Sequence, residues 1–463
     1  MSLPNAPHRT WEERDRSHLL HPFLPDSQQR RVVMVEGEGC VLRDATGREY
    51  LDATAGMWLC QVGHGRTEIA EAAARQMSRL EYSTAFWDFT HDRAISLAER
   101  LVGLAHPATG RAFFTSGGSE GTETALRMAR NFHHRRGAPD RTWVLTRTRA
   151  YHGAGYASGE LSDFPAYTSG FGPQPGHVHR LTAPYPYAHA RSGADGPEDV
   201  TEFCLRELEE AIHRIGPHRI AALIGEPVLA LGGMVAPPTD YWPRVAELLR
   251  AHGILLIMDE VVTAFGRTGS WYSAGQMGVQ PDLTVLSKGL TSGYFPLGAV
   301  LLTRRIADVL GAGDGFPVGH TYSAHPTGCA VAEANLDIIE REHLLDAAGA
   351  IGARLATALA PLEALPLVGE VRQHGLMIGV EVVADKALGR PLPHGTYALA
   401  DLIRDRTGVL VRGGPRSLTL APPLVMTPEQ ADHVGTALFD VLSGHPAPAS
   451  GEPAPVPAPV QAR

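Results

Sequence analysis

The sequence predicts an α/β protein with a parallel sheet at its centre. Between about residue 110 and residue 305, short apolar segments alternate with helical patterns such as DYWPRVAELLRAHG. The apolar segments are RAFFTS, TWVLT, IAALIGE, GILLIMDE, LTVLSK and LGAVLLT. Strands that are apolar on both faces and are separated by helices are typical of a parallel sheet that helices cover on both sides.

Length and charge limit the possible functions. The chain has 463 residues, of which 44% are hydrophobic and 20% are charged. This size exceeds what one hydrophobic core usually serves, so we expect two or more subdomains. The formal net charge is -9. A mild negative charge disfavours nucleic acid or an anionic membrane as the partner, because both require clustered Lys and Arg.

Cysteine usage and the distribution of apolar residues predict a cytoplasmic protein. The four cysteines lie far apart and form no CxxC pair, so we expect neither a zinc site nor a disulfide framework. No N-terminal segment has the apolar core of a signal peptide, and no other segment has the length of a membrane span. Residues 443–463 are rich in Pro and Ala and are predicted to form a disordered tail.

Polar residues stand where several of the predicted strands end. Ser116 to Glu120 follow the first strand, Glu226 ends the third, Asp259 ends the fourth and Lys288 ends the fifth. Ligands of open α/β sheets bind outside the carboxyl ends of the strands. A polar residue that caps a strand would explain any one of these positions, but four ends with complementary chemistry predict a site.

Lys288 and Asp259 form a chemically meaningful pair. A lysine desolvated at a strand end tends to lose its proton, and a neutral amine can form a Schiff base with a carbonyl. Burying the Asp259 carboxylate at the end of GILLIMD costs free energy unless a cation, such as a protonated pyridine nitrogen, pairs with it. A lysine that forms a Schiff base and an aspartate on a pyridine nitrogen are typical of a pyridoxal phosphate site. The alternative for Lys288 is a surface lysine that begins a loop.

The segment FFTSGGSEGTETALRMARNF predicts a strand, a tight turn and a helix. The apolar residues of the helix recur on one face, at Ala125, Met128, Ala129 and Phe132. Free N–H groups at Gly118 and Ser119, at the positive end of the helix, could bind a phosphate. A tight turn explains the glycines equally well.

Two further residues could enclose an aromatic ring. Tyr151, in AYHGAGY, could stack on one face of it. Val261, two residues after Asp259, could contact the other face. Either residue could instead belong to the core.

In their order along the chain these motifs resemble those of the class III (omega) aminotransferases, which have the pyridoxal phosphate fold type I. The resemblance extends from SHLLHPF to LTLAPPLVMT, and DEVVTAFGRTG is among its most specific parts. It implies a large cofactor domain over residues 65–320, with a central, mostly parallel sheet covered by helices. It also implies a smaller α+β domain, built from residues 1–64 and 325–442.

The resemblance also implies roles for individual residues. Lys288 would form the Schiff base with pyridoxal 5'-phosphate and move the proton between the substrate carbon and C4′ of the cofactor. Asp259 would pair with the pyridine nitrogen, and Glu226 would lie close to Asp259. The ring would lie between Tyr151 and Val261, and the phosphate would be bound by Gly118, Ser119 and Thr321. Thr321 would come from the neighbouring subunit, so the resemblance implies a homodimer.

The resemblance also indicates residues that would bind the substrate. Arg412 matches an arginine that binds a substrate carboxylate and swings aside for amines that lack one, although Arg416 lies nearby. Leu231 occupies a position where glutamate-using members have a glutamate, which favours alanine and pyruvate over 2-oxoglutarate. Trp58 and Phe86 match aromatic residues of the substrate pocket. Both could instead be core aromatics.

We therefore expect an omega-aminotransferase that moves an amino group by a ping-pong mechanism. The donor would be a primary amine or an amino acid, with alanine as a candidate, and the acceptor a keto acid, ketone or aldehyde. One alternative is an enzyme of a natural-product pathway that aminates a large carrier- or peptide-linked carbonyl. Others are a related aminomutase or racemase, or a non-catalytic binding protein, although the latter would be expected to have lost Lys288 or Asp259.

Overall fold

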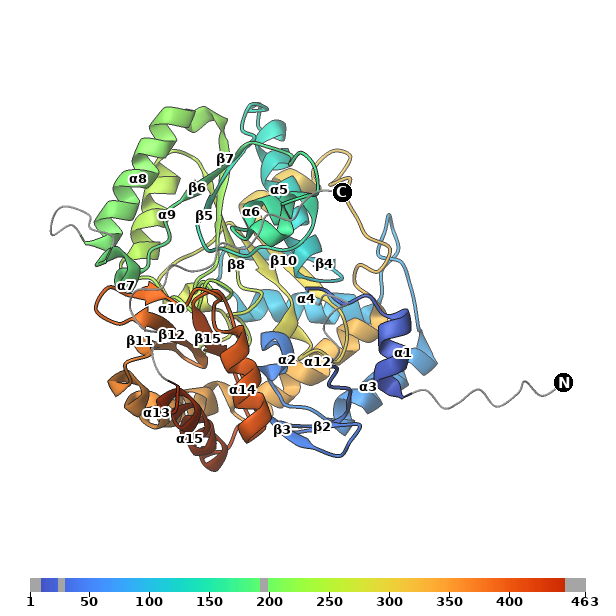
Figure 1. Cartoon of the computed structure of the whole chain (residues 1–463). Helices are drawn as coiled ribbons and strands as arrows, with labels where there is room; N and C mark the ends of the chain where they lie inside the picture. Colours follow the sequence, from blue (N-terminus) through green and yellow to red (C-terminus); the bar gives the residue numbers. More distant parts are fainter. Residues whose placement is uncertain (1–9, 24–29, 192–198, 446–463) are drawn as a thin grey trace.

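A computed structural model describes residues 10–23, 30–191 and 199–445 (Figure 1). Its central sheet has seven strands in the order β4-β10-β9-β8-β7-β5-β6. Their bounds are β4 Thr109–Thr115, β5 Trp143–Arg147, β6 Val178–Leu181, β7 Ile220–Gly225, β8 Leu255–Asp259, β9 Leu283–Leu286 and β10 Gly298–Thr303. Only β10 is antiparallel to its neighbours, β4 and β9. The sheet is therefore mostly parallel, and the predicted fold class is confirmed.

Helices cover both faces of this sheet because side chains alternate between the faces along each strand. Leu223 of β7 and Leu256 of β8 pack against α8 (Val200–Ile215) and α9 (Tyr241–Ala251). The next residues along, such as Ile224 and Ile257, belong to a second cluster with α5 (Gly118–Arg135) and α11 (Arg304–Gly311). The helix face predicted for α5 is buried in this cluster, at Ala125, Met128, Ala129 and Phe132.

Two smaller sheets lie beside the central one. The first joins distant parts of the chain, because the C-terminal strand β14 pairs in parallel with the N-terminal strand β3. Its strands are β1 Met34–Glu38, β2 Val41–Asp44, β3 Glu49–Asp52 and β14 Val409–Leu410. The second sheet consists of β11 Val368–His374, β12 Met377–Asp385, β13 Arg390–Pro391 and β15 Ser417–Leu420. Figure 1 shows helices α13, α14 and α15 around these strands.

The remaining helices complete the described chain. They are α1 Trp11–His18, α2 Ala55–Trp58, α3 Thr67–Arg79, α4 Asp92–Leu104, α6 Tyr156–Leu161, α7 Pro186–His189, α10 Ser273–Gln276, α12 Pro326–Arg341, α13 Leu344–Leu359, α14 Tyr397–Thr407 and α15 Pro428–Ser443. Short 3-10 helices span Pro165–Tyr167, Pro217–Arg219, Lys288–Leu290 and Ala360–Ala364. None of the helices in the described part of the chain has the length and apolar character that a membrane span requires.

The division of the chain into domains at residues 65–320 and 325–442 stays a prediction. The pairing of β3 with β14 is consistent with a smaller domain that draws on both ends of the chain. Residues 446–463, which make up most of the predicted disordered tail, lie outside the described residues.

Candidate active site

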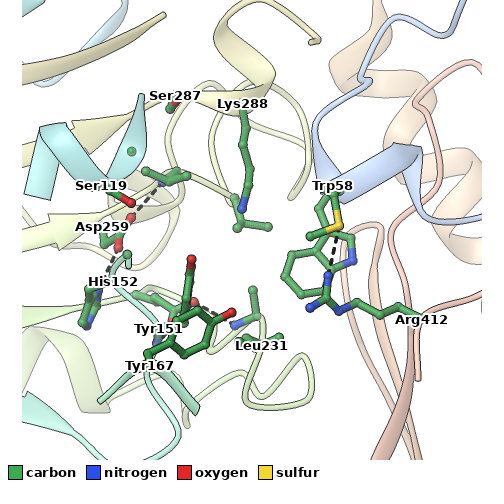
Figure 2. A pocket seen from close by; sticks show the side chains of 17 residues that line it. Trp58, Ser119, Tyr151, His152, Tyr167, Leu231, Asp259, Ser287, Lys288 and Arg412 are labelled. Atoms are coloured by element: carbon green, nitrogen blue, oxygen red, sulfur yellow. Dashed lines mark hydrogen bonds and ion pairs between the residues drawn. The ribbon is translucent and has the colours of Figure 1, made fainter. Parts of the chain in front are cut away.

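A cavity of about 200 Å³ opens at the carboxyl ends of the parallel strands (Figure 2). Loops that follow β4, β5, β7, β8 and β9 meet there with parts of the N- and C-terminal segments. The predicted site residues on its wall are Trp58, Gly118, Ser119, Tyr151, Glu226, Leu231, Asp259, Val261, Lys288 and Arg412. Residues that are distant in the sequence therefore converge on one cavity, as their positions at strand ends predict.

Lys288 is the second residue after β9, and its side chain points into the cavity. Its backbone has φ 47°, in the left-handed region that non-glycine residues rarely adopt. Such strained residues cluster at functional sites, where the surrounding structure holds them in place. Burial lowers the pKa of the Lys288 amine to about 8, although the charges of Asp259 and Glu226 oppose this shift. At pH 7 about a tenth of the amine is therefore neutral and nucleophilic, and the neutral form predominates above pH 8.

Asp259, the last residue of β8, is buried at the cavity wall and is held by two hydrogen bonds. One carboxylate oxygen accepts from the Val261 N–H at 3.1 Å, and the other lies 2.7 Å from Nδ1 of the buried His152. Among the described residues Nε2 of His152 has no hydrogen-bond partner. A proton on Nε2 would be left unpaired, so we place the proton on Nδ1, which donates to Asp259. This bond orients the carboxylate and leaves it a negative charge for a cation in the cavity.

The N-terminus of α5 provides the anion-binding part of the wall. Gly118 and Ser119 are the first two residues of this 18-residue helix, and both line the cavity. Helices leave their first N–H groups without partners inside the helix, and the macrodipole makes this end positive. A side chain on Gly118 would lie 3.1 Å from Val261, so the glycine keeps the helix end close to that residue.

Two tyrosines form the wall opposite Lys288. The rings of Tyr151 and Tyr167 lie 5.1 Å apart between centroids (Figure 2). The Tyr151 N–H donates to Oε1 of Glu226 at 3.1 Å, and Oε2 of Glu226 accepts from the Ala230 N–H at 2.9 Å. Burial raises the pKa of Tyr151 and also that of Glu226. Glu226 thus ties the loops after β5 and β7 together behind the cavity.

Arg412 and Trp58 form another wall, next to Leu231. The Arg412 guanidinium lies 4.9 Å from the centroid of the Trp58 ring and donates to the Met57 sulfur at 3.1 Å. No carboxylate lies within ion-pair distance of Arg412 in the described part of the chain, and burial lowers its pKa. Arg416 instead forms an ion pair with Glu381 at 2.7 Å. Of the two arginines considered from the sequence, only Arg412 lines the cavity.

Two predicted site residues, Phe86 and Thr321, do not line the cavity of their own chain. Both belong to a surface patch, here named the aromatic patch, that consists of Tyr82, Phe86, Trp87, Phe89, Thr321 and Tyr322. The Tyr82 hydroxyl donates to the Thr321 carbonyl at 2.9 Å, and the rings of Tyr82 and Tyr322 lie 6.5 Å apart. Thr321 is exposed, and Phe86 is half-buried beside Trp87.

The cavity is also lined by His152 and Tyr167, which the sequence did not predict as site residues. His152 directly follows Tyr151, and its position in the YHG motif was the available signal. Tyr167 is the last residue of a short 3-10 helix and has no motif around it, so only the fold places it against Tyr151.

The residues present fit pyridoxal phosphate. The Lys288 amine, whose pKa is lowered, can react with the carbonyl group of the cofactor. The buried Asp259 carboxylate can pair with the ring nitrogen, and the N-terminus of α5 can bind the phosphate.

Comparisons with known proteins agree with this reading. The family profile described as Aminotransferase class-III matches residues 24–442. The putrescine–pyruvate aminotransferase of Pseudomonas aeruginosa is 36% identical over 440 residues, which cover 94% of this chain and 96% of that protein. The diaminobutyrate–2-oxoglutarate transaminase of Halomonas elongata is 36% identical over 446 residues, covering 92% and 94% of the two chains.

Solved structures give the same result. An (S)-enantioselective omega-transaminase from Thermomicrobium roseum has a TM-score of 0.89 at 43% identity, covering 94% of this chain and 99% of that one. An amine transaminase from an uncultivated Pseudomonas species, in its PLP-bound form, has a TM-score of 0.87 at 40% identity, covering 92% and 98%. The chain therefore belongs to the class III aminotransferases, and it is a transaminase that depends on pyridoxal phosphate.

Proposed function

We propose that this transaminase moves an amino group between a primary amine or an amino acid and a keto acid, ketone or aldehyde, with alanine and pyruvate as one such pair. The observation that carries this proposal is the placement of the Lys288 amine and the Asp259 carboxylate on one cavity wall, at the ends of neighbouring strands. When bound, pyridoxal phosphate supplies a carbonyl that takes up the amine and a ring that withdraws electrons from the adjacent carbon.

The protein's own residues would hold the cofactor and move a proton. Lys288 would bind the cofactor carbonyl and then carry the proton between the substrate carbon and C4′. Asp259 would accept a hydrogen bond from the protonated ring nitrogen, with His152 holding the orientation of the carboxylate. Tyr151 and Val261 would contact the ring faces, and Gly118 and Ser119 would bind the phosphate.

The cavity wall formed by Arg412, Trp58 and Leu231 suits a substrate with a carboxylate next to the reacting carbon, or an apolar amine. No carboxylate of the described residues forms an ion pair with Arg412, and a guanidinium can hold a carboxylate through two parallel hydrogen bonds. Leu231 is apolar, so it offers no charge that would neutralise Arg412. The two relatives named above are named for different acceptors, pyruvate and 2-oxoglutarate. Because the apolar Leu231 favours pyruvate over 2-oxoglutarate, we assign pyruvate as the acceptor.

We further propose that two copies of the chain form the active enzyme. Large aromatic side chains of the aromatic patch are exposed, with Trp87 at 88%, Tyr322 at 62% and Phe89 at 60%. Exposed apolar clusters of this kind mark protein interfaces. The patch adjoins α5. His320, the residue before Thr321, lies 3.3 Å from the hydroxyl of Thr124, which belongs to α5. A second copy seated on the patch would bring Thr321 and Phe86 of one chain towards the cavity of the other.

Replacement of Lys288 tests the proposed reaction. We expect Lys288→Ala to lower the rate of amino transfer from L-alanine and from a panel of amines by at least about 1,000-fold, because both nucleophile and proton carrier are lost. The measurement is product formation in a coupled assay, together with the visible spectrum of the bound cofactor. The chain has one other lysine, Lys386, which is exposed to solvent outside the cavity, so Lys386→Ala is the matched control. Substantial transfer by Lys288→Ala would overturn the assignment.

The pKa of Lys288 gives a pH dependence that can be measured without catalysis. Because burial lowers this pKa from 10.5 to about 8, the neutral amine predominates above pH 8. We expect amine-specific labelling of Lys288 in the cofactor-free protein to rise with pH, with half of the maximal rate near pH 8. Mass spectrometry of the Lys288 peptide measures the rate, and the Lys386 peptide corrects for decay of the reagent. A midpoint near 10.5 would contradict the buried environment.

The Arg412→Ala variant tests substrate recognition. Hydrogen bonds to charged groups contribute roughly 1.5–3 kcal/mol, so we expect kcat/KM for alanine and for pyruvate to fall about 10- to 100-fold. The half reaction with an amine that lacks a carboxylate should change much less. Stopped-flow measurement of each half reaction separates the two effects. Equal losses for both substrates would remove Arg412 from this role.

The oligomeric state tests the proposed dimer. Light scattering should give a mass twice that of the 49.6 kDa chain. We expect Trp87→Asp to yield monomers with little activity, since a buried unpaired charge at the interface is costly. Leu388→Asp is the control, because Leu388 is an exposed apolar residue outside the aromatic patch. A fully active monomer would contradict the proposal.

A further inference from the structure

The turn that carries Lys288 has a strained backbone. Lys288 begins a 3-10 helix that ends at Leu290, and its φ is 47°. Ser292, four residues later, has φ 49°. Residues with a side chain rarely adopt this left-handed region, and they remain in it only where the surrounding structure holds them. In Figure 2 the Lys288 side chain extends from this turn into the cavity, so the contacts of the turn decide where the amine lies.

Asn335, on α12, contacts this turn through its side-chain amide. The residue is fully buried, and its Nδ2 donates to the carbonyls of Gly289 at 2.9 Å and of Leu290 at 3.0 Å. An amide NH2 group has two N–H donors, so it can serve both carbonyls at once. Gly289 and Leu290 directly follow Lys288, so both hydrogen bonds act on the strained part of the turn.

The hydrogen bonds fix the orientation of the Asn335 amide. Its Oδ1 has no hydrogen-bond partner among the described residues. If the amide were rotated by half a turn, Oδ1 would face two carbonyl oxygens, which accept and cannot donate. The neighbours of Asn335 along the buried face of α12 are apolar, namely Val331, Ala332, Ile338 and Ile339. A buried amide among them costs free energy, and the two carbonyls after Lys288 offset this cost.

A segment near the N-terminus contacts the same turn. The Gln61 N–H donates to the Ser292 hydroxyl at 3.2 Å, and Nε2 of Gln61 donates to the Ala264 carbonyl at 3.2 Å. A Cβ atom at Gly289 would lie 2.7 Å from this Nε2, so a larger residue there would displace Gln61 from its hydrogen bonds. Gln61 therefore limits the space around the turn, whereas Asn335 donates hydrogen bonds to the carbonyls of the turn.

We infer that Asn335 positions Lys288 for amino transfer by holding the lysine backbone in its left-handed conformation. Asn335 acts through the carbonyls of Gly289 and Leu290, because it does not line the cavity itself. Without these two hydrogen bonds the turn can relax to a negative φ, which a lysine favours. The Cα–Cβ bond of Lys288 would then change direction, and the amine would leave the cavity wall. This inference rests on the role that we propose for Lys288.

A stability measurement on the cofactor-free protein tests the backbone conformation. Glycine adopts φ 47° without steric cost, so Lys288→Gly should unfold at a higher urea concentration than Lys288→Ala. The same pair is then compared in the Asn335→Ala background, at the same protein concentration. If the turn relaxes there, the difference between the two midpoints should disappear or change sign, because glycine gains more entropy on unfolding. Equal differences in both backgrounds would contradict the inference.

Amine-specific labelling of Lys288 tests the position of its side chain in the cofactor-free protein. Burial lowers the pKa of this amine to about 8 against the charges of Asp259 and Glu226, with a further contribution from Arg412 and Arg267. We expect Asn335→Ala to move the labelling midpoint by about one pH unit towards 10.5, since the displaced amine is better hydrated. Asn335→Ser keeps one hydroxyl donor and should have a smaller effect. A midpoint that stays near pH 8 in both variants would contradict the inference.

Holoenzyme kinetics connect the turn with the reaction. In the half reaction with L-alanine we expect Asn335→Ala to lower the maximal rate about 10- to 100-fold, because a misplaced amine loses part of the contribution of general acid–base catalysis. The alanine concentration that gives half of this rate should change less than about threefold, since Arg412 and Trp58 are unaltered. Stopped-flow spectroscopy of the bound cofactor measures both quantities.

Leu438→Ala is the matched control for a loss of stability. Leu438 lies on α15, is buried in the core and does not line the cavity. This variant should lower the urea midpoint but leave the labelling midpoint and the half-reaction rate unchanged. If Asn335→Ala does not fold, Asn335→Ser takes its place in all three measurements.

The outcomes separate positioning from simple stabilisation. If the Asn335 and Leu438 variants have the same effects on labelling and on the half reaction, the inference is overturned and Asn335 only stabilises the fold. If Lys288→Ala itself transfers amino groups, the proposed role of Lys288 fails, which is a different outcome. The stability and labelling measurements still decide whether Asn335 holds the turn, because neither of them depends on catalysis.

Discussion

The pairing of β8 with β9 is the constraint on which the rest of the site depends. Asp259, at the end of β8, lies opposite Val285 in the ladder, and the Glu260 N–H donates to the Val285 carbonyl at 3.0 Å. This register fixes Lys288, three residues after Val285, relative to Asp259. A slip of one residue would turn each side chain of the strand to the opposite face of the sheet. The backbone ladder, rather than a contact between Lys288 and Asp259, therefore sets the spacing that a cofactor would have to match.

The cavity places the Lys288 amine and the carboxylates of Glu226 and Asp259 in buried surroundings that disfavour charge. Each group responds differently. Burial lowers the pKa of Lys288 and raises that of Glu226, whereas Asp259 receives the buried hydrogen bond of His152. Glu226 serves the fold, because its two oxygens bind backbone N–H groups of separate loops. The reactive lysine therefore depends on a set of buried polar groups, each of which has its own hydrogen-bond partners.

Much of this could be predicted from local patterns in the sequence. The six apolar segments are all strands of the central sheet, and ten predicted residues line one cavity. The strand β6 was missed because VHRL carries two polar residues and lies at the edge of the sheet, so it lacks the continuous apolar pattern of a central strand. The antiparallel direction of β10 could not be predicted either, because an apolar segment has the same pattern in both directions.

The sequence by itself determined which segments form strands, which helix face is buried and which residue types end the strands, since these depend on neighbours within a few positions. Only the tertiary structure decided the partners: His152 for Asp259, Glu381 for Arg416, and Trp58 for Arg412. It also placed Phe86 and Thr321 on a surface patch instead of in the cavity. Hydrogen bonds and ion pairs require contact in space, and the residues that make contact are chosen by how the sheets pack and pair.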